Sequence, residues 1–263
     1  MKPCPLPPDA PPSDPSQKAR ILAIETRAFH AWPALEDVRH GGWLLRRAAG
    51  FTKRANSANA AALQASFEGV QAAAEAFYAH HRLPAVFRMT PLAPPEADAQ
   101  LEAAGYQSFD PSCVLTCALD AAPPTPDDAA VDIAPHPSPG WLDGFAAANG
   151  VPAQHQAVHH AMVGAIAPPA GFATLRQNGA AIGFGLAVVE DGAAGLFDIV
   201  IDPAHRRQGY GAALVRALLR WSRDAGARWA YLQVRAQNPA ALALYEGLGF
   251  KRLYRYHYRV PPL

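Results

Sequence analysis

Between residues 130 and 260 the apolar and polar positions follow a pattern typical of alternating strands and helices. Apolar runs bounded by Gly-containing turns predict strands at 130–134, 172–177, 180–190, 194–202, 229–234 and from residue 250 onward. Helical spacing of apolar residues predicts helices near 139–149, 154–165, 209–225 and 239–248. We therefore expect an α/β (α+β) fold, with a mixed, largely antiparallel twisted sheet flanked by helices.

Two proline-rich stretches divide the chain. Prolines crowd residues 1–17, and because proline removes a backbone donor and disfavours helix, we predict a mobile tail there. A second break, DAAPPTPDD at 120–128, separates two regions that both carry periodic apolar patterning. The predicted domains are therefore 18–122 and 128–263.

The two regions also resemble each other in sequence. With an offset of 144 residues and no gaps, AVFRMTPLAPPEADAQLEAAGY falls on WAYLQVRAQNPAALALYEGLGF, and Phe77 falls on Trp221. Alanine-rich sequence could produce such matches by chance. We expect instead a tandem of two related folds.

The segment DIVIDPAHRRQGYGAALVRAL, residues 198–218, carries the clearest chemical signal. A β-rich run ends near Asp202, a basic turn follows, and Gly209 and Gly211 open a helix. The first N–H groups of a helix lack intrahelical partners, the macrodipole makes that end positive, and glycines let an anion approach. Because Arg206 and Arg207 can fork onto phosphate oxygens, the segment is suited to a pyrophosphate.

These glycines have other interpretations, which the sequence matches less well or which assign no ligand to them. The segment lacks the Gly-Lys-Ser/Thr of a Walker loop, and Leu214 stands where a dinucleotide fingerprint has its third glycine. The glycines could also form a tight turn before an ordinary helix, with solvated arginines.

These residues resemble the acetyl-CoA signature of the GCN5-related N-acetyltransferase (GNAT) family. RRQGYG at 206–211 matches its Q/R-x-x-G-x-G/A pattern between a strand and a helix, and NPAA at 238–241 followed by YEGLGF at 245–250 resembles its N-x-x-A…Y-x-x-x-G-F element. The resemblance covers residues 130–260 and is weaker in the N-terminal half. It implies acetyl-CoA as cosubstrate and direct transfer of the acetyl group from the thioester to an amine.

The resemblance also implies which residues form the site. Expected cofactor contacts are Ile199, Val200, Ile201, Arg206, Arg207, Gln208, Gly209, Tyr210, Gly211, Ala212, Asn238 and Ala241. Tyr245 is expected near the CoA sulfur as general acid, with a core aromatic as the alternative. Asn238 could also cap the helix that begins at Pro239, which is compatible with cofactor contact.

The N-terminal region carries other residues where the offset of 144 places this signature. The counterparts of Gly209, Gly211, Asn238 and Tyr245 are Ala65, Phe67, Pro94 and Leu101. Side chains would then block the phosphate approach and the acid would be missing. We therefore expect a degenerate, noncatalytic half.

Acceptor contacts are predicted in two places. Asp198 immediately precedes the expected pantetheine strand and ranks first for contact with the acceptor, without a proton being assigned to it. The N-terminal region holds a polar and aromatic cluster of Trp32, Trp43, Arg46, Arg54, Asn56 and Ser57. We expect the tryptophans to be packing residues, with residues 43–45 in a core strand, whereas exposed Arg54 and Asn56 could line an acceptor pocket shared between the halves.

The general base is left open among Asp198, Glu190, His155, His159 and His160. His155 and His159 are four residues apart and share a helix face, which resembles half of a metal site. Because no further ligand is evident, we expect a solvated helix face and no metal.

Composition narrows the compartment and the partners. The 263 residues are 50% hydrophobic and carry a net charge of +1, so no strong field would recruit nucleic acid or an anionic membrane. The three cysteines lack paired spacing, and no apolar run approaches the roughly 20 residues of a membrane span. We expect a cytoplasmic enzyme acting on a small-molecule or peptide amine, of undetermined oligomeric state. A noncatalytic acyl-CoA-binding sensor is the alternative, and the presence of Tyr245 beside the signature favours the enzyme.

Overall fold

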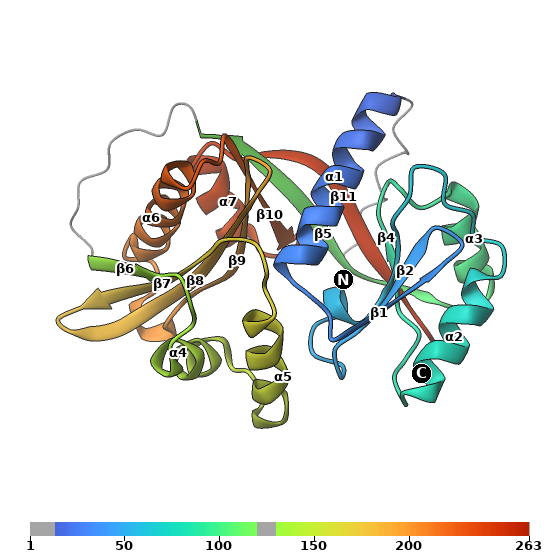
Figure 1. The fold of residues 1–263 in the computed structure, drawn as a ribbon, viewed down its shortest axis with the longest axis horizontal. Helices are drawn as coiled ribbons and strands as arrows, with labels where there is room; N and C mark the ends of the chain where they lie inside the picture. The colour runs from blue at the N-terminus through green and yellow to red at the C-terminus, as the bar shows by residue number, and fades with distance from the viewer. Residues whose placement is uncertain (1–13, 120–129, 263) are drawn as a thin grey trace. The chain divides into compact units, whose positions relative to one another are not determined.

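The computed structural model describes residues 14–119 and 130–262 (Figure 1). Most of the predicted tail and the break at 120–128 lie outside these residues. The tail prediction was wrong at its end, because helix α1 (Pro15–Ala31) already begins at Pro15. Proline is tolerated at the first position of a helix, and Asp14 caps this one by accepting a hydrogen bond of 2.9 Å from the backbone N–H of Ser16.

The chain divides into two compact units, and the division differs from the predicted one. Unit 1 comprises residues 1–114, 235–237 and 253–263, and unit 2 comprises residues 115–234 and 238–252. Strands β5 (Gln107–Ala118) and β11 (Lys251–Val260) therefore have residues in both units. The end of β11 belongs to unit 1 because it pairs with β4, with His257 opposite Met89. Sequence patterning does not reveal which strand is the partner of another.

Unit 2 contains the elements that carry the predicted signature. Its strands lie in the order β10-β9-β8-β7-β6, where β9 and β10 are parallel and the other neighbours antiparallel. The strand bounds are β6 (Ala130–Ala134), β7 (Ala170–Gln177), β8 (Ala180–Glu190), β9 (Ala193–Ile201) and β10 (Trp229–Arg235). The helices are α4 (Pro139–Asn149), α5 (Ala153–Gly164), α6 (Tyr210–Asp224) and α7 (Pro239–Gly247), with a short 3-10 helix, η2, at Pro203–His205. These bounds confirm the predicted elements of this half to within about two residues.

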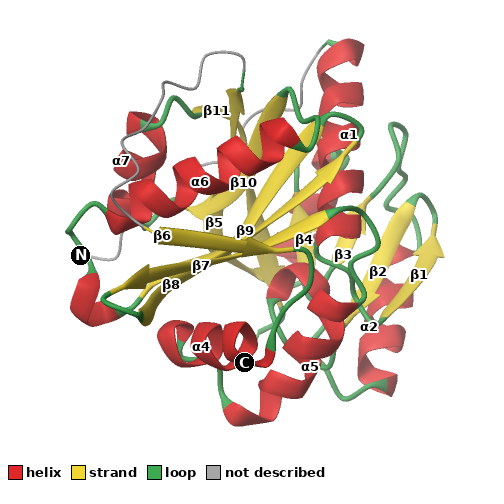
Figure 2. Cartoon of the chain, turned by 60° about the vertical axis from the view of Figure 1, so that its left-hand side comes forward, coloured by secondary structure: helices red, strands yellow, loops and turns green. Residues whose placement is uncertain are grey.

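Helices cover both faces of the unit 2 sheet (Figure 2). A Cβ at Gly144 of α4 would meet the ring of Phe184, whereas a Cβ at Gly185 would meet Leu218 of α6. Neighbouring residues of a strand point to opposite faces, so α4 and α6 lie on opposite sides of β8. The predicted α/β class, a mixed and largely antiparallel sheet flanked by helices, is confirmed.

Unit 1 is built in a similar way. Its strand order is β1-β2-β3-β4-β11, with β3 and β4 parallel and the other neighbours antiparallel. The strands are β1 (Glu36–His40), β2 (Trp43–Arg47), β3 (Ala58–Ala60) and β4 (Phe87–Met89), and the helices after α1 are η1 (Lys53–Ala55), α2 (Val70–His80) and α3 (Pro95–Ala103). Trp32 and Trp43 are buried, which confirms the predicted packing role and the core strand.

Several elements of the two units are separated by the same number of residues. Helices α3 and α7 have nine residues each and start 144 positions apart, as do β5 and β11. Helices α2 and α6 also end 144 positions apart, but α2 has 11 residues and α6 has 15. The ungapped comparison therefore misplaces the start of α2. The residue before α2 is Gly69, with a left-handed φ of 71°, and the residue before α6 is Gly209, with a left-handed φ of 85°. Pairing Gly209 with Ala65 was wrong because α2 is one turn shorter.

Candidate active site

A β-bulge interrupts β9 next to the predicted signature. Phe197 pairs with Leu186 and Val200 with Phe184, so Asp198 and Ile199 stand opposite the single residue Gly185. Asp198 adopts a left-handed φ of 51° within this bulge. A Cβ at Gly185 would lie 2.9 Å from Ile199 Cδ1, so a larger residue there would require the Ile199 side chain to shift.

Strand β9 leaves its parallel neighbour just before the bulge. The Cα register between β9 and β10 runs from Ala193 opposite Trp229 to Leu196 opposite Leu232. Strand β9 continues to Ile201 past that register, along Ile199, Val200 and Ile201, which were predicted to contact the pantetheine arm. Strands that part after a parallel pair create a place where an extended ligand can hydrogen-bond to backbone groups.

The loop after β9 leads into a helix tip that is suited to an anion. Arg207 at φ 60° and Gly209 at φ 85° are both left-handed, and Gly209 forms the N-cap of α6. A Cβ at Gly209 would meet no atom within 4 Å, so the space beside it is open. Gln208, Gly209 and both arginines are exposed. The start of α6 thus presents unpaired backbone donors and positive charge to an accessible surface.

Arg206 is tied to the strand end. Its Nε donates a hydrogen bond of 3.0 Å to the carbonyl of Ile201. Asp202 caps η2 by accepting a hydrogen bond from Ala204 N–H at 2.8 Å, and this backbone hydrogen bond lowers the pKa of Asp202. These contacts shape the basic loop between β9 and α6.

Three predicted segments converge at Gly211. A Cβ at this position would lie 3.3 Å from Leu244 Cδ2 of α7 and 4.0 Å from Ile201 Cγ1 of β9. The end of β9, the first turn of α6 and the helix that carries Tyr245 therefore meet at one point. Glycine at 211 serves this close packing as well as any approach of a ligand.

Tyr245 lies on the buried side of α7. It is 8% exposed, and its ring packs edge-on against Phe250 with centroids 5.8 Å apart. Desolvation by burial raises the pKa of its phenol to about 12. The hydroxyl therefore keeps its proton at neutral pH and can act as a donor.

The predicted capping role of Asn238 is confirmed. Its Oδ1 accepts a hydrogen bond of 3.1 Å from the backbone N–H of Ala241, and Pro239 occupies the first helical position. Asn238 is exposed and Ala241 half-buried. Both therefore stand at the accessible start of α7.

Asp198 is joined to a buried histidine. His159 Nε2 lies 2.8 Å from Asp198 Oδ2, and the two side chains are 0% and 10% exposed. The imidazole packs against Phe145 and Trp141 of α4, with ring centroids 4.7 and 6.2 Å away. The expected solvated histidine face was wrong for His159, because this face of α5 packs onto α4 and β9. Composition alone does not signal the pair, since the two residues are 39 positions apart.

The other candidate bases are less well placed or less well supported. Glu190 pairs with Ala193 at the start of β9, roughly 25 Å of strand away from Ile201 at about 3.3 Å per residue. His155 and His160 are half-buried on α5. The structure thus brings His159, and not Glu190, to the bulge.

Asn56 was wrongly expected to be exposed. It is buried, its Oδ1 accepts hydrogen bonds from Ala48 N–H and Gly50 N–H at 2.9 and 2.8 Å, and its Nδ2 donates to Phe51 O at 2.8 Å. An amide saturated by backbone in this way organises the loop around it. Arg54 is half-buried, with its guanidinium 5.7 Å from the ring centroid of Trp32.

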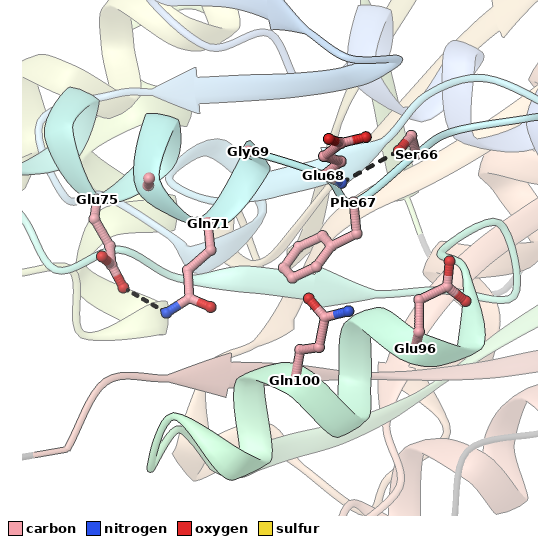
Figure 3. Close-up of a pocket in the computed structure, with 9 residues that line it drawn as sticks. Ser66, Phe67, Glu68, Gly69, Gln71, Glu75, Glu96 and Gln100 are labelled. Carbon is pink, nitrogen blue, oxygen red and sulfur yellow. Dashed lines mark hydrogen bonds between the residues drawn. The ribbon is translucent and has the colours of Figure 1, made fainter.

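Unit 1 contains a cavity of about 580 Å³ at the start of α2, to which α2 and α3 both contribute side chains (Figure 3). Its lining includes Glu68, Glu75 and Glu96 beside Gly69. Glu75 accepts hydrogen bonds of 2.9 Å from Gln71 Nε2 and from the hydroxyl of Tyr106. Of these carboxylates Glu68 lies in the segment before α2, whereas Glu75 lies within α2 and Glu96 in the first turn of α3.

Comparison with known proteins agrees with this geometry. The profile of the family described as "Probable histone acetyltransferase Rv0428c C-terminal" matches residues 18–259. "Uncharacterized N-acetyltransferase YobR" of Bacillus subtilis is 31% identical over 244 residues, covering 91% of this chain and 98% of that protein. The "[Ribosomal protein bS18]-alanine N-acetyltransferase" of Escherichia coli is 45% identical over 76 residues, 29% of this chain and 51% of that enzyme. A "GCN5-related N-acetyltransferase from Kribbella flavida" has the same fold, with a TM-score of 0.71, 16% identity and coverage of 92% and 95%.

The chain therefore belongs to the GCN5-related N-acetyltransferases and is an acyltransferase of that family. Acetyl-CoA is the general acyl donor of this family. Within residues 14–119 and 130–262, no helix combines the length and the apolar character needed to cross a bilayer.

Proposed function

We propose that unit 2 binds acetyl-CoA and transfers its acetyl group directly to an amine acceptor. The observation that carries this proposal is the convergence at Gly211 of β9, the tip of α6 and the helix bearing Tyr245. A cofactor that is long, has a diphosphate near one end and a thioester at the other needs these features together: an anion site, a free strand edge and a donor.

The residues present fit the donor. Backbone N–H groups of Gln208, Gly209, Tyr210 and Gly211 would bind the diphosphate, because they surround an open, positively polarised helix tip. Ala212, whose N–H donates to Gly209 O at 3.0 Å, would line the same tip. Arg206 and Arg207 would add charge-assisted hydrogen bonds. Strand residues 199–201 would hold the pantetheine arm, and Asn238 and Ala241 would border it from α7.

Bound acetyl-CoA supplies the activated acyl thioester that an unprotonated amine can attack. Tyr245 would donate a hydrogen bond to the departing sulfur. Because its pKa of about 12 exceeds the roughly 8.5 of an ordinary thiol, the phenol serves chiefly as a hydrogen-bond donor to the thiolate rather than losing its proton completely. The base that takes the proton of the amine is not assigned.

The acceptor is a small-molecule or peptide amine. The name of the Escherichia coli relative specifies the alanine of a ribosomal protein, and the 76 matched residues support a peptide amine as acceptor here. Asp198 would face the acceptor, because it lies on the bulge beside the diverging strands and is held on the α5 side by His159.

We further propose that unit 1 is a related but noncatalytic copy. The equal spacing of α3 and α7 and of β5 and β11 supports common ancestry, and the left-handed glycine before α2 supports a retained helix tip. Glu68, Glu75 and Glu96 would repel the anionic diphosphate, and Leu101 corresponds to Tyr245. Loss of cofactor binding would thus follow from charge rather than from a blocked helix tip.

Calorimetry of the full chain with acetyl-CoA tests the proposal, followed by an assay of CoA release over a panel of amines and peptides. We expect saturable binding with about one site per chain and turnover on at least one acceptor. Tight binding without turnover on any acceptor would favour a noncatalytic acyl-CoA sensor, and a chain that binds no acetyl-CoA would contradict both.

A further inference from the structure

The β9 bulge depends on an unfavourable backbone conformation. Asp198 is a residue with a Cβ at a φ of 51°, in the left-handed region where glycine is the natural choice. Such conformations persist only where the surrounding contacts stabilise them. Something in unit 2 must therefore hold residue 198 in place.

His159 provides one such contact. Its ring is completely buried, and Trp141 and Phe145 on α4 restrict its orientation. From this position Nε2 reaches Asp198 Oδ2 at 2.8 Å, so the carboxylate is drawn toward α5. Residue 198 cannot return to an extended β conformation without moving that carboxylate away from its donor, since successive strand residues point to opposite faces.

The conformation of residue 198 in turn affects the cofactor edge. The bulge lies two residues after Leu196, where the register with β10 ends, and immediately before Ile199. Bulges bend a strand and increase its twist. The bulge therefore directs residues 199–201 away from continued pairing with β10 and toward the helix tip at Gly211.

We propose that His159 is a positioning residue for the acetyl-CoA site, which acts by stabilising the left-handed conformation of Asp198 and hence the divergence of β9 from β10. This inference rests on the proposed function. His159 is buried away from solvent and does not itself contact the donor; it acts through Asp198 on the backbone of residues 199–201.

Substitutions at residue 198 test whether His159 acts by stabilising the backbone conformation of residue 198 or only by pairing with its carboxylate. The full chain is compared as wild type, His159→Phe, His159→Gln, and His159→Phe combined with either Asp198→Gly or Asp198→Ala. Glycine tolerates the left-handed conformation and removes the carboxylate, whereas alanine removes the carboxylate but does not favour the conformation. Glutamine retains a side-chain N–H donor. The measurement is the dissociation constant of acetyl-CoA by calorimetry, with circular dichroism to confirm folding.

We expect His159→Phe to weaken acetyl-CoA binding by about tenfold or more, and His159→Gln to retain most of the affinity. In the His159→Phe background, Asp198→Gly should restore the affinity and Asp198→Ala should not. Equal rescue by glycine and alanine would show that an unpaired carboxylate caused the loss, and would overturn the proposal. An unchanged affinity in His159→Phe, or no rescue by glycine, would overturn it as well. If His159→Phe fails to fold, the acetyl-CoA affinities of the two double variants are compared with that of wild type. The proposal requires the Asp198→Gly double variant to bind as wild type does and the Asp198→Ala double variant to bind more weakly.

The failure of the proposed function would be visible separately. If wild type binds no acetyl-CoA, amide hydrogen exchange at residues 199–201 still tests the positioning role. Exchange should accelerate in His159→Phe and return toward the wild-type rate only with Asp198→Gly. Equal exchange rates in all variants would contradict the inference whatever the donor is.

Discussion

Leu244 packs against Gly211, so closely that a Cβ at residue 211 would lie 3.3 Å from Leu244 Cδ2. This contact sets how near α7 comes to the first turn of α6. Tyr245 follows Leu244 directly, so a larger residue at 211 would require the side chain next to the phenol-bearing residue to shift. Gly209, two residues earlier, has open space around it and a different role, and the two glycines should respond differently to substitution.

Asparagine in place of Gly209 should separate folding from binding. Asparagine tolerates the left-handed conformation, so the free energy of unfolding should fall by less than about 1 kcal/mol. The new side chain would nevertheless occupy the open space where we place the diphosphate. We expect acetyl-CoA affinity to fall by about tenfold or more in calorimetry, with an almost unchanged melting temperature.

The matched control is Gly226→Asn. Gly226 is also left-handed, at φ 95°, and a Cβ added there would meet no atom within 4 Å, but it follows the end of α6 instead of preceding its start. Gly226→Asn should leave affinity unchanged. Equal losses from both substitutions would argue against a diphosphate at the tip of α6.

Arg206→Ala should weaken binding of acetyl-CoA more than binding of S-acetylpantetheine, which lacks the diphosphate. A charge-assisted hydrogen bond to phosphate contributes about 1.5–3 kcal/mol, and this contribution is screened by salt. Parallel titrations at low and high ionic strength measure both effects. Equal losses for the two ligands would mean that Arg206 acts only through its hydrogen bond to Ile201 O.

Tyr245→Phe should lower kcat by about a hundredfold while leaving KM for acetyl-CoA unchanged, because the lost interaction forms only as the thiolate departs.

The burial of Tyr245 should also make the free energy of unfolding depend on pH. Desolvation raises the pKa of Tyr245 to about 12, above the roughly 10 of an unfolded tyrosine, so the folded state retains its proton longer and stability falls as pH rises from about 10 to 12.

Chemical denaturation of both proteins across this pH range measures that effect. Tyr245→Phe should lose less stability than wild type between pH 10 and 12, because phenylalanine does not titrate. Parallel pH profiles for the two proteins would contradict the burial of this phenol, and an unchanged kcat would remove Tyr245 from the mechanism.

Asp98→Asn should destabilise unit 1. Asp98 accepts hydrogen bonds from Arg259 Nε and Nη2 at 2.8 and 2.9 Å and lies 2.8 Å from His257 Nε2, so it connects α3 to the end of β11. Desolvation acts to raise the pKa of Asp98, but the hydrogen bonds from Arg259 and His257 outweigh it and hold the pKa well below its usual range. We expect a loss of about 1–3 kcal/mol at pH 7.

The pH dependence of this loss follows from the lowered pKa. The stabilisation is present above the ordinary aspartate pKa and disappears as pH falls through the lower, folded-state value, so the difference between Asp98→Asn and wild type should shrink in strong acid. Asp132→Asn is the control, because Asp132 forms an exposed ion pair with Arg176 at 3.2 Å. A comparable loss in that variant would show that burial of the Asp98 cluster is not the cause.

Much of unit 2 could be read from local sequence. Apolar periodicity predicted its strands and helices because each element has one buried face, and Gly209 marked the start of α6 because a left-handed cap favours glycine. Asn238 and Pro239 marked the start of α7 for a similar local reason. These features depend on residues within a few positions of one another.

The features of the fold and site that local sequence patterns did not predict depend on contacts between distant segments. The ungapped comparison assigned Ala65 where the shorter α2 places Gly69, because a missing helical turn changes the spacing without breaking the apolar pattern. Asn56 looked exposed because its backbone partners are set by loop closure. Glu190 looked close to the site although it ends β8, opposite the start of β9. Single-chain patterns contain no information on strand order or register.

The amino-acid sequence by itself determined the order of the elements and the glycine-capped helix tip, since these follow from periodicity and backbone preferences, and its motifs at 206–211 and 238–250 resemble those of the family. Tertiary structure alone decided that His159 reaches Asp198 across 39 residues, that β9 leaves β10 after Leu196, and that Leu244 closes on Gly211. The reason is physical: side-chain burial and hydrogen bonding between separate elements arise only when the sheet and its covering helices pack together.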